Sequence, residues 1–158
     1  MSFLENRIPP PIIMLLIAAV IIWSCWQTIG MAEPLLWLLA SSVFFIGAVV
    51  ALAALRAFRR QQTTINPLAP ERASSLVCSG VFAFSRNPMY LAMLLWLSAV
   101  AIVAGIGWQW LGPMVFGLFI NRFQIVPEER AMQKLFGKEY GDYSQQVSRW
   151  LGWRFNRN

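Results

Sequence analysis

The chain contains no histidine, and this is the first constraint on its chemistry. Histidine general bases, histidine metal ligands and Ser-His-Asp triads are therefore excluded. Its two cysteines, Cys25 and Cys78, are too few to form a zinc site by themselves. Because Cys25 lies inside an apolar run, we also expect no structural disulfide. The sequence thus predicts a protein without a metal cofactor.

Charge is also scarce. Charged residues make up 13% of the 158 residues, whereas about a quarter is usual in a soluble domain. Hydrophobic residues reach 58%, eight residues are tryptophan, and the mean hydropathy is +0.54. This composition excludes an intrinsically disordered chain. A soluble core of this size could not bury so much apolar surface, so we expect lipid to surround much of the protein.

Four apolar segments match or approach the roughly 20 residues needed to cross a bilayer. The predicted transmembrane helices are 8–29, 34–58, 88–105 and 108–126. Only Gly105-Ile106-Gly107 separates the last two, which predicts a tight antiparallel hairpin. The predicted fold is an all-α integral membrane protein with four transmembrane helices, forming a single membrane domain over residues 1–158.

Basic residues are absent from both short turns between these helices, 30–33 and 105–107. Apart from Arg56, the 13 lysines and arginines lie at the N-terminus, in the 59–87 loop or from Arg122 onward. Because basic residues prefer the cytoplasmic side, we expect both termini and the long loop in the cytoplasm. The net charge of +6 then reflects topology and attraction to membrane lipids. It gives no reason to expect nucleic acid as a partner.

The C-terminal part is more polar than the rest. Residues 127–138 are prone to form a helix, and Gly137 is a plausible helix stop. A second amphipathic piece follows, with Tyr140, Tyr143 and Val147 at helical spacing. We expect these helices and the 59–87 loop to form a cytosolic cap, made of segments 59–87 and 127–158, which holds most of the polar groups.

Three polar clusters fall in or beside this cap: Arg86–Tyr90, Glu128-Glu129 and Asn121–Gln124. The first has a simple structural explanation. Asn87 is a favoured helix N-cap and Pro88 a favoured first helical residue. Arg86 would then bind a lipid phosphate.

The other two clusters also have structural explanations. Glu128 and Glu129 follow Pro127, so they are candidates for first-turn acids that complement a helix dipole. Arg122, near the end of a predicted span, is placed to extend its charge toward the headgroups. Taken singly, each of these explanations is favoured over a catalytic role.

Taken together, two stretches have a distinctive order and spacing: LVCSGVFAFSRNPMYLAM, then NRFQIVPEERAMQKLFGKEYGDYSQQV. They resemble the isoprenylcysteine carboxyl methyltransferase family of integral membrane methyltransferases, to which the phospholipid N-methyltransferases are related. The resemblance runs from about Asn66 to Trp150. It implies a methyltransferase that uses S-adenosyl-L-methionine, held in a cytosolic pocket, and a lipophilic or lipid acceptor that enters from the membrane.

The resemblance also implies roles for individual residues. It implies Arg86 and Glu129 as catalytic residues and Arg122 and Gln124 as substrate-binding residues. The cofactor-binding residues that it implies are Ser74, Ser75, Leu76, Val77, Phe82, Asn87, Pro88, Met89, Tyr90 and Glu128.

The chain departs from the family pattern at three positions. Phe82 replaces a tyrosine, Asn87 a histidine and Gln124 a substrate-contacting arginine. The last change removes a charge suited to a carboxylate substrate. Methyl transfer needs alignment more than acid–base help, so the lack of histidine is no obstacle for a carboxylate or thiolate acceptor. An amine would need to lose a proton, through Glu129 or water.

Two other functions remain open from the sequence. Membrane sterol and steroid reductases have a similar C-terminal layout and use NADPH, and basic residues are available for its phosphates. A non-catalytic membrane scaffold that keeps the fold is the other. Retention of Arg86, Tyr90 and both glutamates favours the enzyme, because a scaffold needs none of them.

Overall fold

The computed structural model describes residue 5 and residues 8–29, 32–61 and 75–152. These residues form an all-α fold without a β-strand, as the sequence predicts. The helices are α1 (Pro10–Ser24), α2 (Trp26–Ile29), α3 (Pro34–Arg60), α4 (Pro88–Ala104), α5 (Leu111–Ile120) and α6 (Val126–Gln146). Two 3₁₀ turns, η3 (Gly80–Ala83) and η4 (Trp108–Trp110), and a π-helical segment, η5 (Asn121–Ile125), lie between them.

The helices α3 and α4 begin at the prolines that the sequence singles out, Pro34 and Pro88. A proline suits this position because the first helical N–H groups have no partner within the helix. The predicted helix 8–29 is instead divided at Cys25, where α1 ends and the short α2 begins.

The predicted fourth helix does not end at residue 126. Helices α5, η5 and α6 form one continuous rod, in which the Val126 N–H donates to the Asn121 carbonyl, a π-type hydrogen bond. Pro127 has no N–H to donate and would clash with the carbonyl four residues earlier in a regular helix. The wider π-helical turn immediately before it accommodates the ring. The rod then bends at Gly137, where φ is +49° and ψ is −117°.

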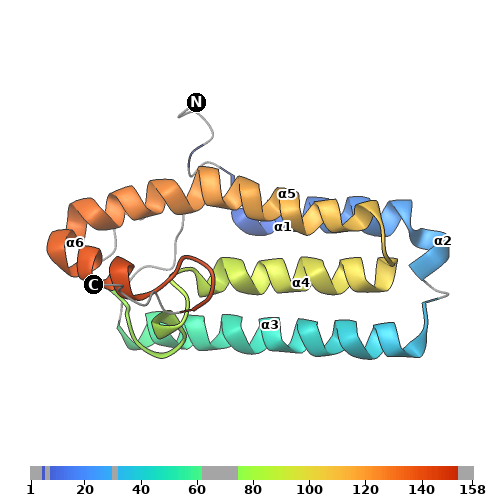
Figure 1. The fold of residues 1–158 in the computed structure, drawn as a ribbon, viewed down its shortest axis with the longest axis horizontal. Helices are drawn as coiled ribbons and strands as arrows, with labels where there is room; N and C mark the ends of the chain where they lie inside the picture. Colours follow the sequence, from blue (N-terminus) through green and yellow to red (C-terminus); the bar gives the residue numbers. More distant parts are fainter. Residues whose placement is uncertain (1–4, 6–7, 30–31, 62–74, 153–158) are drawn as a thin grey trace.

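Figure 1 shows the helices aligned along one long axis, with α4 between α3 on one side and α1 and α5 on the other. The α2 segment and the turn from α4 to η4 lie at one end of the bundle. The η3 turn and α6 lie at the opposite end (Figure 1). The predicted hairpin of the third and fourth helices is therefore present, and the polar segments gather at one end.

Small residues allow α3 to lie close to α4. The buried residues of α3 are Ala40, Gly47, Ala51 and Ala54. A Cβ on Gly47 would stand 2.8 Å from Nε1 of Trp96, too close for a stable contact. Trp96 uses that Nε1 to donate to the Phe44 carbonyl at 3.1 Å. Close helix approach through small residues is typical of helix packing in membranes.

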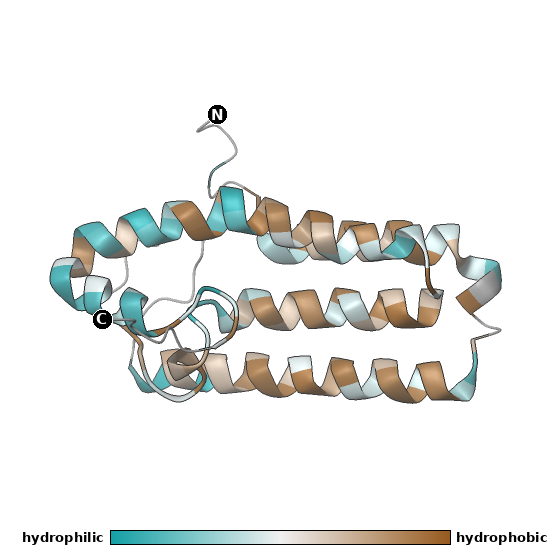
Figure 2. Cartoon of the chain, in the orientation of Figure 1, coloured by the Kyte–Doolittle hydropathy of each residue, from teal (hydrophilic) through white to brown (hydrophobic). Residues whose placement is uncertain are grey.

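Hydrophobic residues dominate the helices of the bundle (Figure 2), and many of their large apolar side chains are exposed. Trp23 on α1, Phe45 on α3 and Leu118 on α5 are 83%, 68% and 68% exposed. An apolar surface this extensive indicates contact with something other than water. Among the described residues, α3 is the one helix both long and apolar enough to span a membrane, whereas α1 and α4 are apolar but shorter.

Candidate functional site

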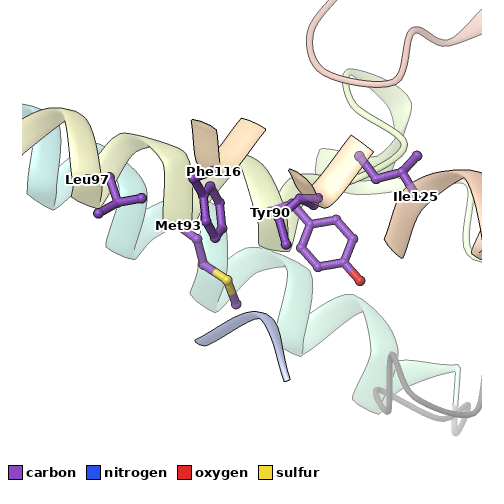
Figure 3. Packing of buried hydrophobic residues seen from close by; sticks show 6 residues of the cluster. Tyr90, Met93, Leu97, Phe116 and Ile125 are labelled. Carbon is purple, nitrogen blue, oxygen red and sulfur yellow. The ribbon is translucent and has the colours of Figure 1, made fainter. Parts of the chain in front are cut away.

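The site begins where the apolar core meets the polar end of the bundle. Tyr90, Met93 and Leu97 of α4 pack with Phe116, Ile120 and Ile125 from the α5–η5 rod. Figure 3 shows Tyr90 between Phe116 and Ile125, with its hydroxyl directed away from Leu97 and Phe116. That hydroxyl donates a short hydrogen bond to Oε1 of Glu128, on the first turn of α6. The pair joins α4 to α6 at the edge of the core.

Glu128 does not occupy a free helix start, contrary to the dipole explanation offered by the sequence. Because η5 runs directly into α6, the backbone N–H groups before Glu128 are already inside a helix. Burial raises the pKa of Glu128 to about 8, and the nearby charge of Glu129 acts in the same direction. The hydrogen bond from Tyr90 opposes this rise in pKa. Glu128 is therefore mostly protonated at neutral pH and ionises readily beside a cation.

Glu129 is held differently, between two guanidinium groups. Arg149 donates from Nε to Oε1 at 2.8 Å and from Nη2 to Oε2 at 2.6 Å, a bidentate pair. Arg86 approaches Oε1 at 3.0 Å from Nη2, and its side chain is only 7% exposed. Arg86 also donates from Nη1 to the Tyr140 hydroxyl at 3.0 Å. Glu129 thus fixes two arginines beside each other.

The backbone after α6 closes against the turn before α4. The Arg86 N–H donates to the Ser148 carbonyl at 3.0 Å, and the Gly152 N–H donates to the Phe84 carbonyl at 2.9 Å. The Asn87 side chain makes no N-cap hydrogen bond, contrary to the capping explanation. Its Nδ2 instead donates to the Arg149 carbonyl at 2.9 Å. Asn87 therefore anchors the C-terminal segment that supplies the Arg149 side chain.

The remaining expected cofactor residues fall into apolar clusters beside this turn. Val77, Phe82 and Met89 pack together with Ala54 and residues near the end of α3. Leu76 packs against Tyr140, Tyr143 and Val147. Ser75 donates to the Gln61 carbonyl at 3.3 Å, and Pro88 is buried at the start of α4. Ser74 lies outside the described residues.

The two expected substrate residues, Arg122 and Gln124, lie in different environments. Arg122 is exposed and pairs with Glu5 at 3.0 Å. Gln124 is fully buried in η5, and its Nε2 donates to the Ile8 carbonyl at 2.9 Å. Its Oε1 is buried and has no hydrogen-bond partner among the described residues. The structure therefore brings Gln124, but not Arg122, into the bundle interior.

Sequence reasoning missed Arg149 and Tyr140 as members of the site. From the sequence, Arg149 is one of the basic residues available for nucleotide phosphates in the reductase alternative, and no spacing rule connects it to Glu129. Tyr140 reads as part of an amphipathic face. Only the bend at Gly137 and the return of the chain at Val147 bring both to Arg86 and Glu129. Among the described residues, no group of three or more acidic or cysteine side chains is placed to bind a metal.

The chain matches the phospholipid methyltransferase family over residues 35–139, more than half of its length. It is 25% identical to a protein-S-isoprenylcysteine O-methyltransferase of Dictyostelium discoideum over 96% of this chain, and it spans 63% of that protein. It is also 48% identical to an uncharacterised protein of Haemophilus influenzae over 40% of this chain and all of that protein. No solved structure matches the chain.

These matches support a methyltransferase and give no support to the reductase alternative. The family match spans the segments that contain Arg86, Tyr90 and the two glutamates. The chain therefore belongs to the phospholipid methyltransferase family, within the group of membrane methyltransferases that resemble the isoprenylcysteine enzymes.

Proposed function

We propose that the protein is an integral membrane methyltransferase that uses S-adenosyl-L-methionine and methylates a lipophilic acceptor. The observation that carries the proposal is the Tyr90–Glu128 pair, an acidic group held at the boundary between the apolar bundle and the polar end. When bound, the cofactor supplies a methyl group on a positively charged sulfur. Both its sulfonium and its ammonium group are suited to a carboxylate partner.

The residues around Glu128 fit such a cofactor. Burial raises the pKa of Glu128 to about 8, so the carboxyl group is mostly neutral when the site holds no cation. A bound cation would favour the ionised carboxylate and pair with it. The Tyr90 hydroxyl fixes one carboxyl oxygen. The apolar side chains of Val77, Phe82 and Met89 beside the same turn offer a dry surface for the uncharged parts of the cofactor.

Arg86 and Glu129 remain the proposed catalytic residues, and their contacts indicate how they act. Both oxygens of Glu129 accept hydrogen bonds from arginine, so its lone pairs are largely engaged. We infer that the Arg86–Glu129 ion pair mainly holds the start of α4 and the start of α6 in a fixed relative position. This would align the methyl donor with the acceptor, which is the main requirement of methyl transfer. A carboxylate or thiolate acceptor needs no proton acceptor, whereas an amine would pass its proton to water or to Glu129.

The proposed membrane arrangement follows from the bundle. Exposed apolar side chains cover its sides, and the α2 segment, the start of α3 and the α4–η4 turn lie at the end opposite α6. Basic residues are absent from those turns and frequent at the α6 end. We therefore propose that four helical segments cross the bilayer, with both termini and the site on the cytoplasmic side. A lipophilic acceptor then reaches Gln124 and Tyr90 from the membrane, and the cofactor enters from the cytosol.

The test is ligand-dependent stabilisation of the purified protein in detergent. A ligand that binds only the native state raises the melting temperature. We expect a concentration-dependent rise with S-adenosyl-L-methionine and with its demethylated product, and little or none with NADPH. A rise with NADPH alone would favour the reductase and contradict the proposal.

A further inference from the structure

A pocket of about 450 Å³ opens beside the Arg86–Glu129–Arg149 group. Arg86, Arg130 and Arg149 line it, together with Glu129, Gln133 and Tyr140. None of the residues expected to bind the methyl donor lines it; the two expected catalytic residues, Arg86 and Glu129, do. The pocket is therefore distinct from the Tyr90–Glu128 pair, although Glu128 and Glu129 are neighbours on α6.

Positive charge exceeds negative charge around this pocket. Arg86 and Arg149 pair with Glu129, whereas Arg130 pairs with Glu5, which also pairs with Arg122. The two groups each hold two arginines on one glutamate, so each leaves one excess positive charge and together they leave two. Positive charges held this close repel one another, and a bound anion would relieve that repulsion. The excess points to an anion as the occupant.

Unused hydrogen-bond donors point the same way. The Arg86 side chain is 7% exposed, and its Nε is buried with no partner among the described residues. A buried guanidinium N–H without an acceptor is costly and calls for a ligand or a water. The Tyr140 hydroxyl accepts from Arg86, which leaves its own proton free to donate. Gln133 also lines the pocket, and its Nε2 already donates one hydrogen bond to the Gly137 carbonyl at 3.0 Å.

We propose that this pocket binds a phosphate group, the anion whose two negative charges and several acceptor oxygens match two excess charges and a fan of guanidinium donors. The phosphate comes either from a phosphomonoester lipid at the membrane surface or from a soluble phosphate. The inference goes beyond methyl transfer and does not require it. Glu5 acts as an internal competitor, because its carboxylate already occupies a donor of Arg130 at 2.5 Å.

The purified protein in maltoside micelles is titrated with each ligand at constant ionic strength, and binding is measured by calorimetry. One arm uses inorganic phosphate, and the other uses mixed micelles that contain phosphatidate or, as a blank, diacylglycerol. We expect saturable binding in at least one phosphate arm. Binding in the phosphatidate arm alone identifies a lipid as the source, and binding in the inorganic arm identifies a soluble phosphate.

Four variants give the binding its location. Arg149→Gln should weaken phosphate binding about tenfold to a hundredfold, the range for loss of one charged hydrogen-bonding partner. Arg130→Gln, which changes an exposed side chain and so should leave the fold intact, should weaken it severalfold. Glu5→Gln should strengthen it, because the competing carboxylate is gone. Lys134→Gln, exposed on the same helix and outside the pocket, should change it less than twofold.

Three results would overturn the proposal. The first is the absence of saturable binding in both phosphate arms. The second is an equal loss in Lys134→Gln and Arg130→Gln, which would mean a general charge effect. The third is competition between phosphate and S-adenosyl-L-methionine, since it would show that the pocket holds the carboxylate of the methyl donor instead.

Discussion

Glu128 and Glu129 are adjacent in sequence but chemically unlike. Glu128 is buried and hydrogen-bonded to a neutral hydroxyl, and burial raises its pKa to about 8. Glu129 accepts bonds from two arginines. The sequence gives both the same explanation, as acids that follow Pro127. The difference arises because the two side chains contact different partners. Glu128 contacts Tyr90 of α4, and Glu129 contacts Arg86, just before α4, and Arg149, in the segment after α6.

Removing the charge of Glu128 gives the first prediction. Glu128→Gln should weaken binding of S-adenosyl-L-methionine by about 1.5–3 kcal/mol, the range for a charged hydrogen bond, or roughly tenfold to over a hundredfold in dissociation constant. The melting temperature without ligand should rise at neutral pH, because glutamine resembles the buried protonated carboxyl and has no proton to lose in the unfolded chain. Glu139→Gln, exposed further along α6, is the matched control. Equal affinities for the two variants would remove Glu128 from the cofactor site.

The second prediction concerns pH. The folded protein holds the Glu128 proton more tightly than the unfolded chain does, with a pKa of about 8 against an ordinary value of 4.5. Its contribution to stability is therefore full below about pH 4.5 and is lost as pH rises through about 8. Cofactor affinity should move the opposite way and rise toward pH 8, because a cation favours the ionised form. The check is to measure the free energy of unfolding and the cofactor affinity of wild type and Glu128→Gln across this pH range. Parallel pH profiles in the two proteins would contradict the prediction.

Single residues also show where sequence reasoning stops. Asn87 has the residue type and position of an N-cap, yet its side chain bonds the Arg149 carbonyl, more than 60 residues away in sequence. The family resemblance selected Tyr90 and Glu128, which the structure joins. Neither pattern nor resemblance selected Arg149, because its partner is set by the return of the chain after α6.

At the scale of elements, helix starts were easier to predict than helix ends. Pro34 and Pro88 mark the beginnings of α3 and α4 because proline is best tolerated where no N–H partner is needed. The same rule fails at Pro127, where a π-helical turn lets the helix continue through the proline. Local propensity cannot tell whether a helix starts at a proline or continues through it. At Pro127 the outcome depends on tertiary contacts of η5, in which Ile125 packs against Tyr90 of α4 and Gln124 bonds the Ile8 carbonyl.

The bend in α6 gives a prediction with a matched control. Gly137 has φ +49° and ψ −117°, a conformation that costs other residues about 1–3 kcal/mol. Gly137→Ala should therefore lower the melting temperature and loosen Tyr140 from Arg86. Gly141→Ala lies in regular helix with open space around its Cβ, so it should stabilise by up to about 1 kcal/mol. Equal shifts in melting temperature for both alanines would show that the bend is not required.

At the scale of the whole molecule, the arrangement of the helices predicts a sidedness. Both native cysteines are first replaced, and single cysteines are then placed at Ile106, fully exposed in the α4–η4 turn, and at Lys138 on α6. A membrane-impermeant thiol reagent should label the Ile106 position in intact cells and the Lys138 position only after permeabilisation. Labelling of the Ile106 position only after permeabilisation would reverse the topology and place the site outside the cell.

The all-α fold and the single polar end were predictable because apolar run length and the distribution of basic residues act over the whole chain. The four-span topology stays a prediction, since α3 alone has both the length and the apolarity to span by itself among the described helices. Helix α4, with 17 residues, would be about 26 Å long, slightly shorter than a bilayer core of roughly 30 Å. Residues that flank the helix, or local thinning of the bilayer, would have to compensate for the shortfall in length.

Methyl transfer to a lipophilic acceptor can be followed with a cofactor labelled in its methyl group. Purified wild-type protein is incubated with labelled S-adenosyl-L-methionine and a membrane lipid extract, and the product is separated by organic extraction and identified by mass. We predict label in an organic-soluble product whose mass has grown by one methylene unit, and a strong decrease with Glu128→Gln but not with Glu139→Gln. Label that stays entirely in the aqueous phase, or transfer that is equal in all three proteins, would contradict the account.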